Sequence, residues 1–316
     1  MKNIVVIGGG SGIFNVLKGL KNYPISITSI VTMFDNGGST GILRDEFGTL
    51  PPGDIRRSLV ALAPDSGNSI LRDLFAYRFP EESSLHGHSF GNLFLQALTS
   101  ISGNEVNAIK KASELLNIEH RILPVSIDNA TLCAELEDGK VIKGEKNIDV
   151  PKHDGSIRIK RIFLEPQAIL YKEAYNAIMD ADLIVIGPGD LYTSILPNLL
   201  VEGFGEAIKK SKAEIVYILN IMTKWGETNG LKASDFARIL LSYLKRDKLD
   251  YIICNSAKLK GDIIKKYESE RSVPVEIDVP ELKKYADNIL KEDVIIQSEI
   301  IRHDPKKISL LIMKLS

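Results

Sequence analysis

Three short apolar segments of this chain each run directly into a glycine-rich polar loop. Residues 4–7 lead into Gly8-Gly9-Gly10-Ser11-Gly12, residues 27–34 lead into the loop 35–41, and residues 183–186 lead into Gly187-Pro188-Gly189-Asp190. In a parallel α/β sheet such loops gather at the carboxyl ends of the strands, where ligands bind and where phosphate groups meet backbone N–H groups. The repetition therefore predicts a parallel sheet with one ligand-binding edge.

Strand-like and helix-like segments alternate along most of the chain. Residues 4–7 and 25–34 are rich in β-branched residues, and the segment 13–21 between them has helical spacing, which indicates a βαβ unit. The spacing predicts further helices over 54–62, 70–75, 89–101, 105–116, 171–179, 198–210 and 234–244, and a last one near Asp304-Pro305. Strands are expected at 183–186, 215–219, 251–254, 275–277 and 294–297. We expect a Rossmann-like three-layer αβα fold with a mainly parallel sheet, as a single domain over 1–316.

The predicted secondary structure changes between about residues 121 and 166, where strand candidates replace the alternation of strands and helices. Short strand candidates follow one another at 124–127, 131–136, 140–142 and 157–164, and Glu137-Asp138-Gly139-Lys140 is a hairpin signal. A small β-rich subdomain embedded at about 121–166 fits this pattern better than continued βα alternation.

Composition excludes several classes of partner. The 40 basic and 41 acidic residues give a net charge of −1, so no global basic field indicates nucleic acid or an anionic membrane. No stretch approaches the roughly 18 apolar residues of a membrane span, and the start of the chain has no secretory pattern. We expect a cytoplasmic protein. Cys133 and Cys254 lack metal-ligand spacing and are expected to be reduced core residues.

The first glycine loop does not satisfy the dinucleotide fingerprint. Gly8 and Gly10 occupy the first two glycine positions, but the third is Ile13, with Gly12 one place early. An NAD-dependent dehydrogenase is therefore a third choice. What remains is a glycine turn opening a helix whose amides can face a phosphate, so the predicted ligand-binding residues here are Gly9, Gly10, Ser11 and Gly12. The alternative is a tight βα turn without a ligand.

The second loop and the segment after it carry more polar groups. Asp35 closes the second strand, where a dinucleotide fold places the acid that contacts ribose, although it could equally hold a metal. Asp54 follows Pro52-Gly53 at a helix start, so it is either an N-cap or a site residue, and Arg56 is either a surface charge or a phosphate clamp. The candidate ligand-binding residues of this region are Asp35, Asn36, Gly37, Gly38, Ser39, Arg44, Gly53, Asp54 and Arg56.

Three later segments add further candidates. His88 and Asn92 fit polar contacts at a helix N-terminus better than a zinc site, because no further cluster completes one. The letters around Ser89 match G-x-S-x-G, but no strong strand precedes them, which argues against a nucleophile elbow. The remaining candidates, on two loops that follow strands, are Gly187, Gly189, Asp190, Ser194, Thr223 and Thr228. The tryptophan of the second loop, Trp225, is either a stacking surface for a base or a packed anchor.

The order of these motifs resembles the gluconeogenesis factor (YvcK-like) branch of the CofD superfamily over about residues 2–236. The motifs are Gly8 to Gly12, Asp35 to Gly41 with Arg44, Pro51 to Arg56, Gly87 to Asn92, Gly187 to Ser194, and Met222-Thr223 with Gly226-Glu227-Thr228. The resemblance implies a regulator that binds UDP-sugars such as UDP-N-acetylglucosamine and supports carbon metabolism, cell shape and wall synthesis. It implies no required cofactor.

The same superfamily implies an alternative. Its founding branch is a magnesium-dependent phospholactate transferase acting on the deazaflavin Fo in coenzyme F420 synthesis, and in that case Asp35 and Asp54 would be the catalytic residues. Asn36 stands where that branch usually has a second acid, so we predict no metal site and a binding protein rather than an enzyme. The expected partners are a nucleotide sugar and further copies of the chain in a homo-oligomer.

Overall fold

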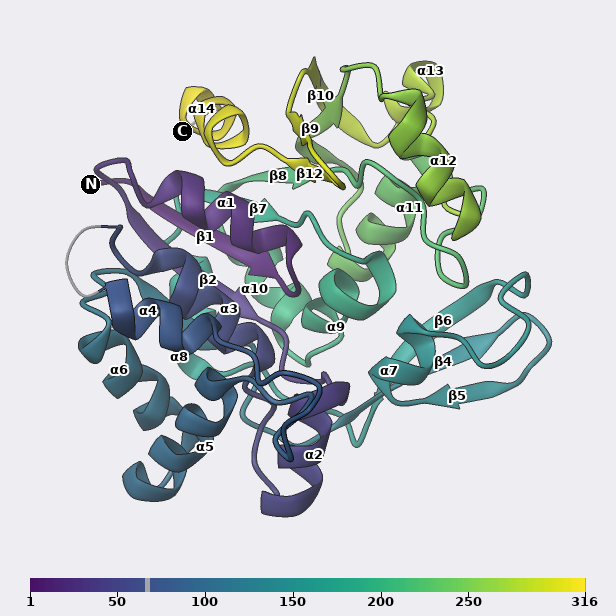
Figure 1. Ribbon diagram of the computed structural model, residues 1–316. Coiled ribbons are helices and arrows are strands. Elements are labelled where there is room, and N and C mark those ends of the chain that lie inside the picture. The colour runs from purple at the N-terminus through teal and green to yellow at the C-terminus, as the bar shows by residue number, and fades with distance from the viewer. Residues whose placement is uncertain (66–68, 316) are drawn as a thin grey trace.

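A seven-stranded sheet forms the centre of the computed structural model, which describes residues 1–65 and 69–315. The strand order is β10-β9-β8-β7-β1-β2-β3, and neighbouring strands are parallel throughout (Figure 1). The strands are β1 Asn3–Gly8, β2 Ser26–Val31, β3 Arg121–Pro124, β7 Leu183–Ile186, β8 Glu214–Ile218, β9 Leu249–Asn255 and β10 Ala286–Glu292. The predicted Rossmann-like α/β fold is confirmed.

Helices cover both faces of this sheet. Alternate residues of β1 point to opposite sides, so that Ile4 and Val6 join one buried cluster while Val5 and Ile7 join another. Helices over Gly12–Leu20, Gly53–Leu62, Phe90–Ser102, Glu105–Leu115, Gly261–Ser269 and Pro305–Leu315 contribute to the first cluster. Helices over Lys172–Met179, Leu196–Leu199, Phe204–Lys210 and Ala233–Leu244 contribute to the second. These two clusters make the fold three-layered, as the alternation predicted.

Most helices lie where the spacing predicted them, but the helices over Gly38–Phe47, Gly261–Ser269 and Val279–Leu282 were not predicted. Their bounds are α1 Gly12–Leu20, α2 Gly38–Phe47, α3 Gly53–Leu62, α4 Ser69–Ala76, α5 Phe90–Ser102, α6 Glu105–Leu115, α8 Lys172–Met179, α9 Leu196–Leu199, α10 Phe204–Lys210, α11 Ala233–Leu244, α12 Gly261–Ser269, α13 Val279–Leu282 and α14 Pro305–Leu315. The helix expected over 198–210 is two helices, α9 and α10. Within the described ranges, no helix is long and apolar enough to cross a membrane.

A small antiparallel sheet lies beside the main body (Figure 1). It has the order β5-β4-β6, with β4 Thr131–Leu136, β5 Val141–Lys143 and β6 Ile159–Glu165, and the short helix α7 Glu145–Asp149 follows β5. We call β4, β5, α7 and β6 the insertion. The expected boundary near 121 differs from the structure, because β3 pairs with β2 in the main sheet.

The C-terminal part differs most from expectation. No strand forms at 275–277, where only an isolated bridge joins Met222 to Pro274. The edge of the main sheet is instead β10, which the pattern did not predict because its residues are largely exposed and polar. Beyond it, β11 Ile295–Gln297 and β12 Ile301–His303 form a hairpin that leads into α14.

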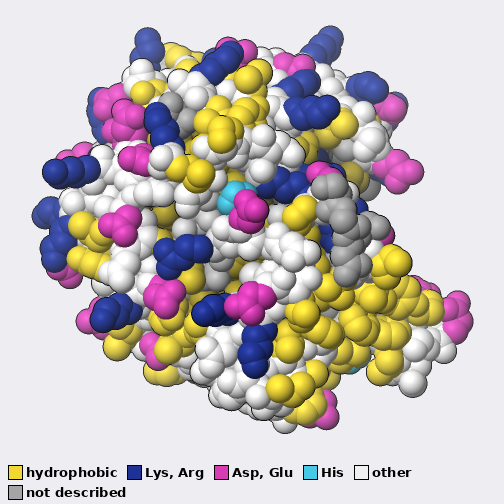
Figure 2. All heavy atoms as spheres, turned by 90° about the vertical axis from the view of Figure 1, so that its left-hand side faces the viewer, with side chains coloured by type: hydrophobic (Ala, Val, Ile, Leu, Met, Phe, Trp, Pro, Cys, Tyr) yellow, Lys and Arg dark blue, Asp and Glu magenta, His cyan; other side chains and the backbone are white. Residues whose placement is uncertain are grey.

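The exposed surface carries both signs of charge. On the face shown in Figure 2, basic and acidic side chains are interspersed, in keeping with the net charge of −1.

Candidate functional site

The chain forms a tight turn directly after β1, and the carboxylate of Asp54 accepts a hydrogen bond from this turn. Gly10 has a φ of +67°, and its N–H donates to Asp54 Oδ1 at 2.9 Å. The same oxygen accepts from Arg57 at 2.7 Å. Asp54 is therefore not the N-cap that was one expectation, since Pro52 holds that position in α3. The Gly10 amide, which was expected to face a phosphate, donates to Asp54 in this structure.

The loop after β7 lies directly against this turn. A Cβ atom on Gly12 would lie 2.0 Å from the carbonyl oxygen of Pro188, so only glycine allows the two loops to approach this closely. The π-helical turn Leu191–Ile195 follows and brings Ser194 beside Gly10. Two of the three glycine loops seen in the sequence thus meet at the carboxyl ends of adjacent strands.

The loop after β2 forms a third wall. Asp35 accepts from the Gly37 N–H at 2.7 Å, and α2 begins at the next residue. Ser39 Oγ lies 3.0 Å from His88 Nδ1 and accepts from Asn92 Nδ2 at 3.2 Å. The Oδ1 atom of Asn92 in turn accepts from Arg56 Nε at 3.0 Å. This network fixes side chains from α2, α3 and α5 around one space.

Two cavities meet at the glycine turn. The larger, about 440 Å³, lies between the turn, α2, α3 and α7, and the smaller, about 220 Å³, lies between the turn and β12. Gly10, Ser11, Asp190 and Ser194 line both. Of the remaining candidate residues, Asp35, Gly37, Gly38, Ser39, Gly53, Arg56 and Asn92 line the larger cavity, and Gly9, Gly12 and Gly189 line the smaller.

The other candidate residues line neither cavity. Arg44 donates to Asn129 Oδ1 and the Ala130 carbonyl, which joins α2 to the segment before β4. Asn36 Oδ1 accepts the N–H of Lys146 at 2.9 Å and so contacts the insertion. Asp54 and His88 make the hydrogen bonds described above to Gly10, Arg57 and Ser39. The Gly187 N–H donates to the Ile7 carbonyl. Thr223 and Thr228 accept backbone N–H groups of Val273 and Lys224. Ser89 caps α5 and accepts from the Asn92 N–H, as expected of a helix start rather than a nucleophile elbow.

Two acids of the larger cavity share a buried environment. Burial and the neighbouring Asp54 raise the pKa of Asp35, and burial together with Asp35 raises the pKa of Glu145 to about 9. Glu145 is the first residue of α7, so its carboxyl group joins the insertion to the end of β2. A neutral Glu145 can share a proton with Asp35, which removes the repulsion between the two carboxylates.

A second acidic cluster surrounds Lys224. Oxygen atoms of Asp149, Asp190 and Glu227 lie within 4.8 Å of one another, an arrangement that could hold a metal ion. However, Lys224 Nζ contacts all three, at 2.8 Å from Asp190 and 3.0 Å from Glu227. Burial alone would lower the pKa of Lys224, but the three carboxylates, Glu227 first, together raise it. The ammonium supplies the positive charge here.

Among the described residues, few carboxylates near the cavities are free to bind Mg²⁺. Asp35 and Asp54 accept hydrogen bonds from backbone and guanidinium groups, Glu145 has a strongly raised pKa, and the other cluster encloses an ammonium. The donor set does not fit a divalent cation well.

Several residues that line the two cavities were not among the predicted site residues. Arg78, Glu145, Lys146 and Asp149 line the larger cavity, and Asn15, Asn220, Tyr267, Arg302 and His303 line the smaller. Glu145, Lys146 and Asp149 come from the insertion, and Arg302 and His303 come from the C-terminal hairpin, where no glycine motif marks them. The one local signal close to Arg302 and His303 was Asp304-Pro305, which marks the start of the last helix.

Comparison with known proteins assigns relatives over the whole length. The family model described as 2-phospho-L-lactate transferase CofD matches residues 4–295. The chain is 42% identical over 314 residues to the gluconeogenesis factor of Bacillus subtilis, covering 99% of this chain and 97% of that protein. It is 44% identical to a putative gluconeogenesis factor of Thermoanaerobacterium thermosulfurigenes over 99% of this chain and 96% of that protein. A crystal structure of a UPF0052 family protein from Bacillus halodurans superimposes with a TM-score of 0.93 at 41% identity, covering 99% of this chain and 100% of that one.

Proposed function

The chain belongs to the CofD family, and from that premise we propose that it binds a nucleotide sugar, as a regulator of the gluconeogenesis factor type. The observation that supports this most is the meeting of two polar cavities at one glycine turn. A ligand with a diphosphate at its centre and a ring system at each end matches that shape. The two volumes together fall within the roughly 300–1,000 Å³ of small-molecule sites.

The diphosphate would lie at the start of α1. The first N–H groups of a helix have no intrahelical partner and carry partial positive charge, and at this helix they belong to Ser11, Gly12 and Ile13 rather than to Gly10. Arg57 and Arg78 line the adjoining cavity and would neutralise the phosphate charge. Arg44 is not part of this proposal, because it points to the segment before β4.

The nucleoside would occupy the larger cavity. Asp35 at the end of β2 and Ser39 in α2 offer acceptors and donors to ribose hydroxyls. The protein would then report the supply of a nucleotide sugar to carbon metabolism, cell shape and wall synthesis in the cytoplasm. The relatives' name, gluconeogenesis factor, supports the link to carbon metabolism.

Thermal denaturation with a panel of ligands tests the proposal. We expect UDP-sugars to raise the melting temperature more than NAD, NADP or ATP does, because a ligand at 100 times its Kd stabilises a fold by about 2.7 kcal/mol. Arg78→Ala should weaken UDP-sugar binding, whereas Arg238→Ala, on the exposed side of α11, should not. Stronger stabilisation by NAD would overturn the proposal. Magnesium-dependent transfer to Fo from a phospholactyl-guanosine diphosphate donor, detected by mass spectrometry, would favour the transferase instead.

A further inference from the structure

The start of helix α2 faces the larger cavity with free backbone N–H groups. The helix has ten residues, and its first three, Gly38, Ser39 and Thr40, all line this cavity. The first N–H groups of a helix have no partner within the helix and carry partial positive charge. No described side chain accepts from these three, because Asp35 accepts from the preceding residue, Gly37.

A buried arginine beside this helix start has no counter-charge. Arg56 is only 7% exposed and lines the same cavity. Its Nε donates to Asn92 and its Nη1 to the Phe75 carbonyl, both of which are neutral acceptors. Among the described residues no carboxylate forms an ion pair with Arg56, and its Nη2 has no partner although it is not closed off from solvent. Buried charges in proteins are normally paired, so an anion is the missing partner.

The neighbouring charges do not supply that partner. Burial, Arg57 and Arg78 lower the pKa of Arg56 to about 10, against the opposing effect of Asp54. The guanidinium is therefore still charged near pH 7. The Asp54 carboxylate is itself hydrogen-bonded to Gly10 and Arg57. Positive charge thus remains in excess around Arg56.

Asn92 links the arginine to the start of α2. Its Oδ1 accepts from Arg56 at 3.0 Å, and its Nδ2 donates to Ser39 Oγ at 3.2 Å. Arg56 and Arg57 are consecutive residues of α3 and so project about 100° apart around the helix axis. Accordingly, Arg57 bonds to Asp54 beside the glycine turn, whereas Arg56 bonds to groups of α4 and α5.

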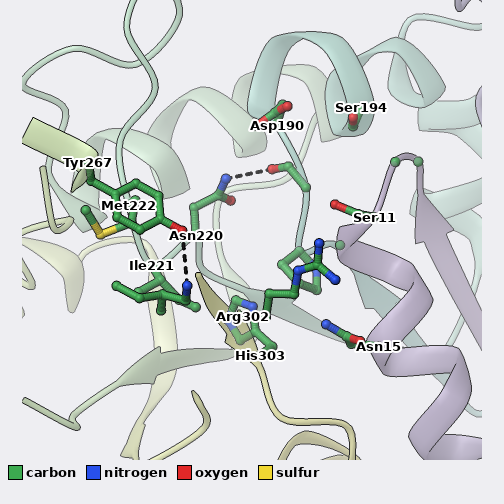
Figure 3. Close-up of a pocket in the computed structure, with 16 residues that line it drawn as sticks. Ser11, Asn15, Asp190, Ser194, Asn220, Ile221, Met222, Tyr267, Arg302 and His303 are labelled. Atoms are coloured by element: carbon green, nitrogen blue, oxygen red, sulfur yellow. Dashed lines mark hydrogen bonds between the residues drawn. The ribbon is translucent and has the colours of Figure 1, made fainter. Parts of the chain in front are cut away.

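The start of α1, where the diphosphate is proposed to lie, is a different position. It borders the smaller cavity, in which Arg302 extends toward Ser11 and Asn15 (Figure 3). Arg56 and the first residues of α2 do not line that cavity. The two helix starts therefore offer two separate places for an anion.

We propose that the start of α2 and Arg56 form a second anion subsite, which binds a phosphate or carboxylate group in addition to the diphosphate at the start of α1. This inference deepens the proposed function and rests on it. The group is either part of the nucleotide sugar or a free phosphate bound beside it. Backbone N–H groups and a guanidinium nitrogen are the donors that such oxyanions accept.

Calorimetric titration with inorganic phosphate, with and without saturating UDP-glucose, tests the subsite. Phosphate should bind the protein that is already saturated with UDP-glucose. Arg56→Gln keeps an N–H at the place of Nε for Asn92 but removes the charge, and should weaken phosphate binding by about tenfold or more. Its affinity for UDP-glucose should stay unchanged. Arg56→Lys keeps a positive charge and should retain more of the phosphate affinity. The matched control is Arg121→Gln, an exposed position of β3, which should change nothing.

UDP-glucuronate shows whether the anionic group belongs to the nucleotide sugar. If the sugar carboxylate occupies the subsite, UDP-glucuronate should bind at least about tenfold more tightly than UDP-glucose, and Arg56→Gln should remove the difference. Equal affinities of the two, together with phosphate binding to the saturated protein, would identify a free anion. Melting curves of each variant establish that it is folded.

The remaining outcomes separate this inference from the proposed function. If the UDP-glucose-saturated protein binds no phosphate and does not prefer UDP-glucuronate, the second subsite is wrong while nucleotide-sugar binding stands. The same holds if Arg56→Gln weakens UDP-glucose as much as phosphate, because Arg56 then binds the diphosphate. If the unmodified protein binds neither UDP-sugar, the proposed function is wrong, and phosphate binding that depends on Arg56 would still identify the subsite.

Discussion

At the scale of single residues, the site depends on close contacts around the glycine turn. Gly12 touches the Pro188 carbonyl from one side, and Asp54 holds the Gly10 amide and Arg57 from the other. These contacts give the turn its shape before any ligand binds. Substitutions at Gly12 and Asp54, each with a matched control, test these contacts.

Gly12→Ala should separate the two glycine loops. Its Cβ would lie 2.0 Å from a backbone oxygen, so either loop has to move, which for an overpacked site costs about 1–3 kcal/mol. Gly261 is the control, because it also begins a helix and its Cβ would enter open space. Urea unfolding should show a loss for Gly12→Ala and none for Gly261→Ala. Equal stability of the two variants would mean that the loops do not pack as the structure describes.

Asp54→Ala should weaken both the fold and ligand binding. The substitution leaves the Gly10 N–H and Arg57 without their shared acceptor, at a cost of about 1–3 kcal/mol for each group left buried. Asp54→Asn keeps an oxygen for Gly10 and should lose less, while Asp73→Ala on an exposed position of α4 should have little effect. Denaturant midpoints and calorimetric affinity measure this. If Asp54→Ala is as stable as Asp73→Ala, the carboxylate does not support the turn.

At the scale of elements, helix α7 connects the insertion to the main body through two carboxyl groups. Its first residue, Glu145, faces Asp35 after β2, and its last residue, Asp149, contacts Lys224 after β8. The larger cavity lies beneath this helix. The strength of both contacts therefore governs how firmly the insertion covers the cavity.

Stability should fall as the pH rises through the range of the Asp35 and Glu145 pair. Folded Glu145, with a pKa of about 9, keeps a proton that the unfolded chain releases above 4.5. Folding thus takes up a proton between these values, and the free energy of unfolding decreases with pH there, by less than about 1.4 kcal/mol per pH unit. Glu145→Gln should flatten the slope, and Glu137→Gln on the exposed hairpin turn should not. Parallel slopes for all three proteins would contradict the shared proton.

Lys224→Met should be strongly destabilising, because it leaves the enclosed Glu227 and two further carboxylates without their cation. Removing one partner of a buried ion pair costs about 3–5 kcal/mol. Adding Glu227→Gln should recover part of that loss. A double-mutant cycle by urea unfolding measures the coupling, and additive effects of the two substitutions would show that Lys224 and Glu227 do not interact.

At the scale of the whole molecule, a bound nucleotide sugar would connect three regions that are distant in sequence. The glycine turns, the insertion and the β11–β12 hairpin all line the two adjoining cavities. A ligand that touches all three regions should stabilise them together.

Hydrogen exchange with and without UDP-N-acetylglucosamine tests this expectation. We expect slower exchange at the turn near 9–12, in α7 of the insertion and around 301–303, because local opening of each region would break contacts with the ligand. Residues 105–115 of α6, remote from both cavities, serve as the internal reference. Protection confined to the glycine turn would show that the ligand does not span the two cavities.

Short-range pattern was enough to predict most of the sheet and one half of the site. The apolar runs ending in glycine loops are local, and the geometry of parallel sheets brings such loops together, so the walls formed after β1, β2 and β7 were predictable. The β-rich insertion followed from its hairpin signal in the same way. The order of motifs also indicated the CofD family, which the comparisons confirm.

Only the tertiary structure decided which way the side chains point. Arg44 and Arg56 are similar in sequence context, yet Arg44 turns to the segment before β4 while Arg56 joins the network with Asn92 and lines the larger cavity. His303 and Asn220 line the same cavity because the C-terminal hairpin contacts the backbone of Leu219 just after β8, a contact between residues far apart in the chain. No local propensity encodes such a contact, because it depends on burial that exists only once the sheet and both helical layers have assembled.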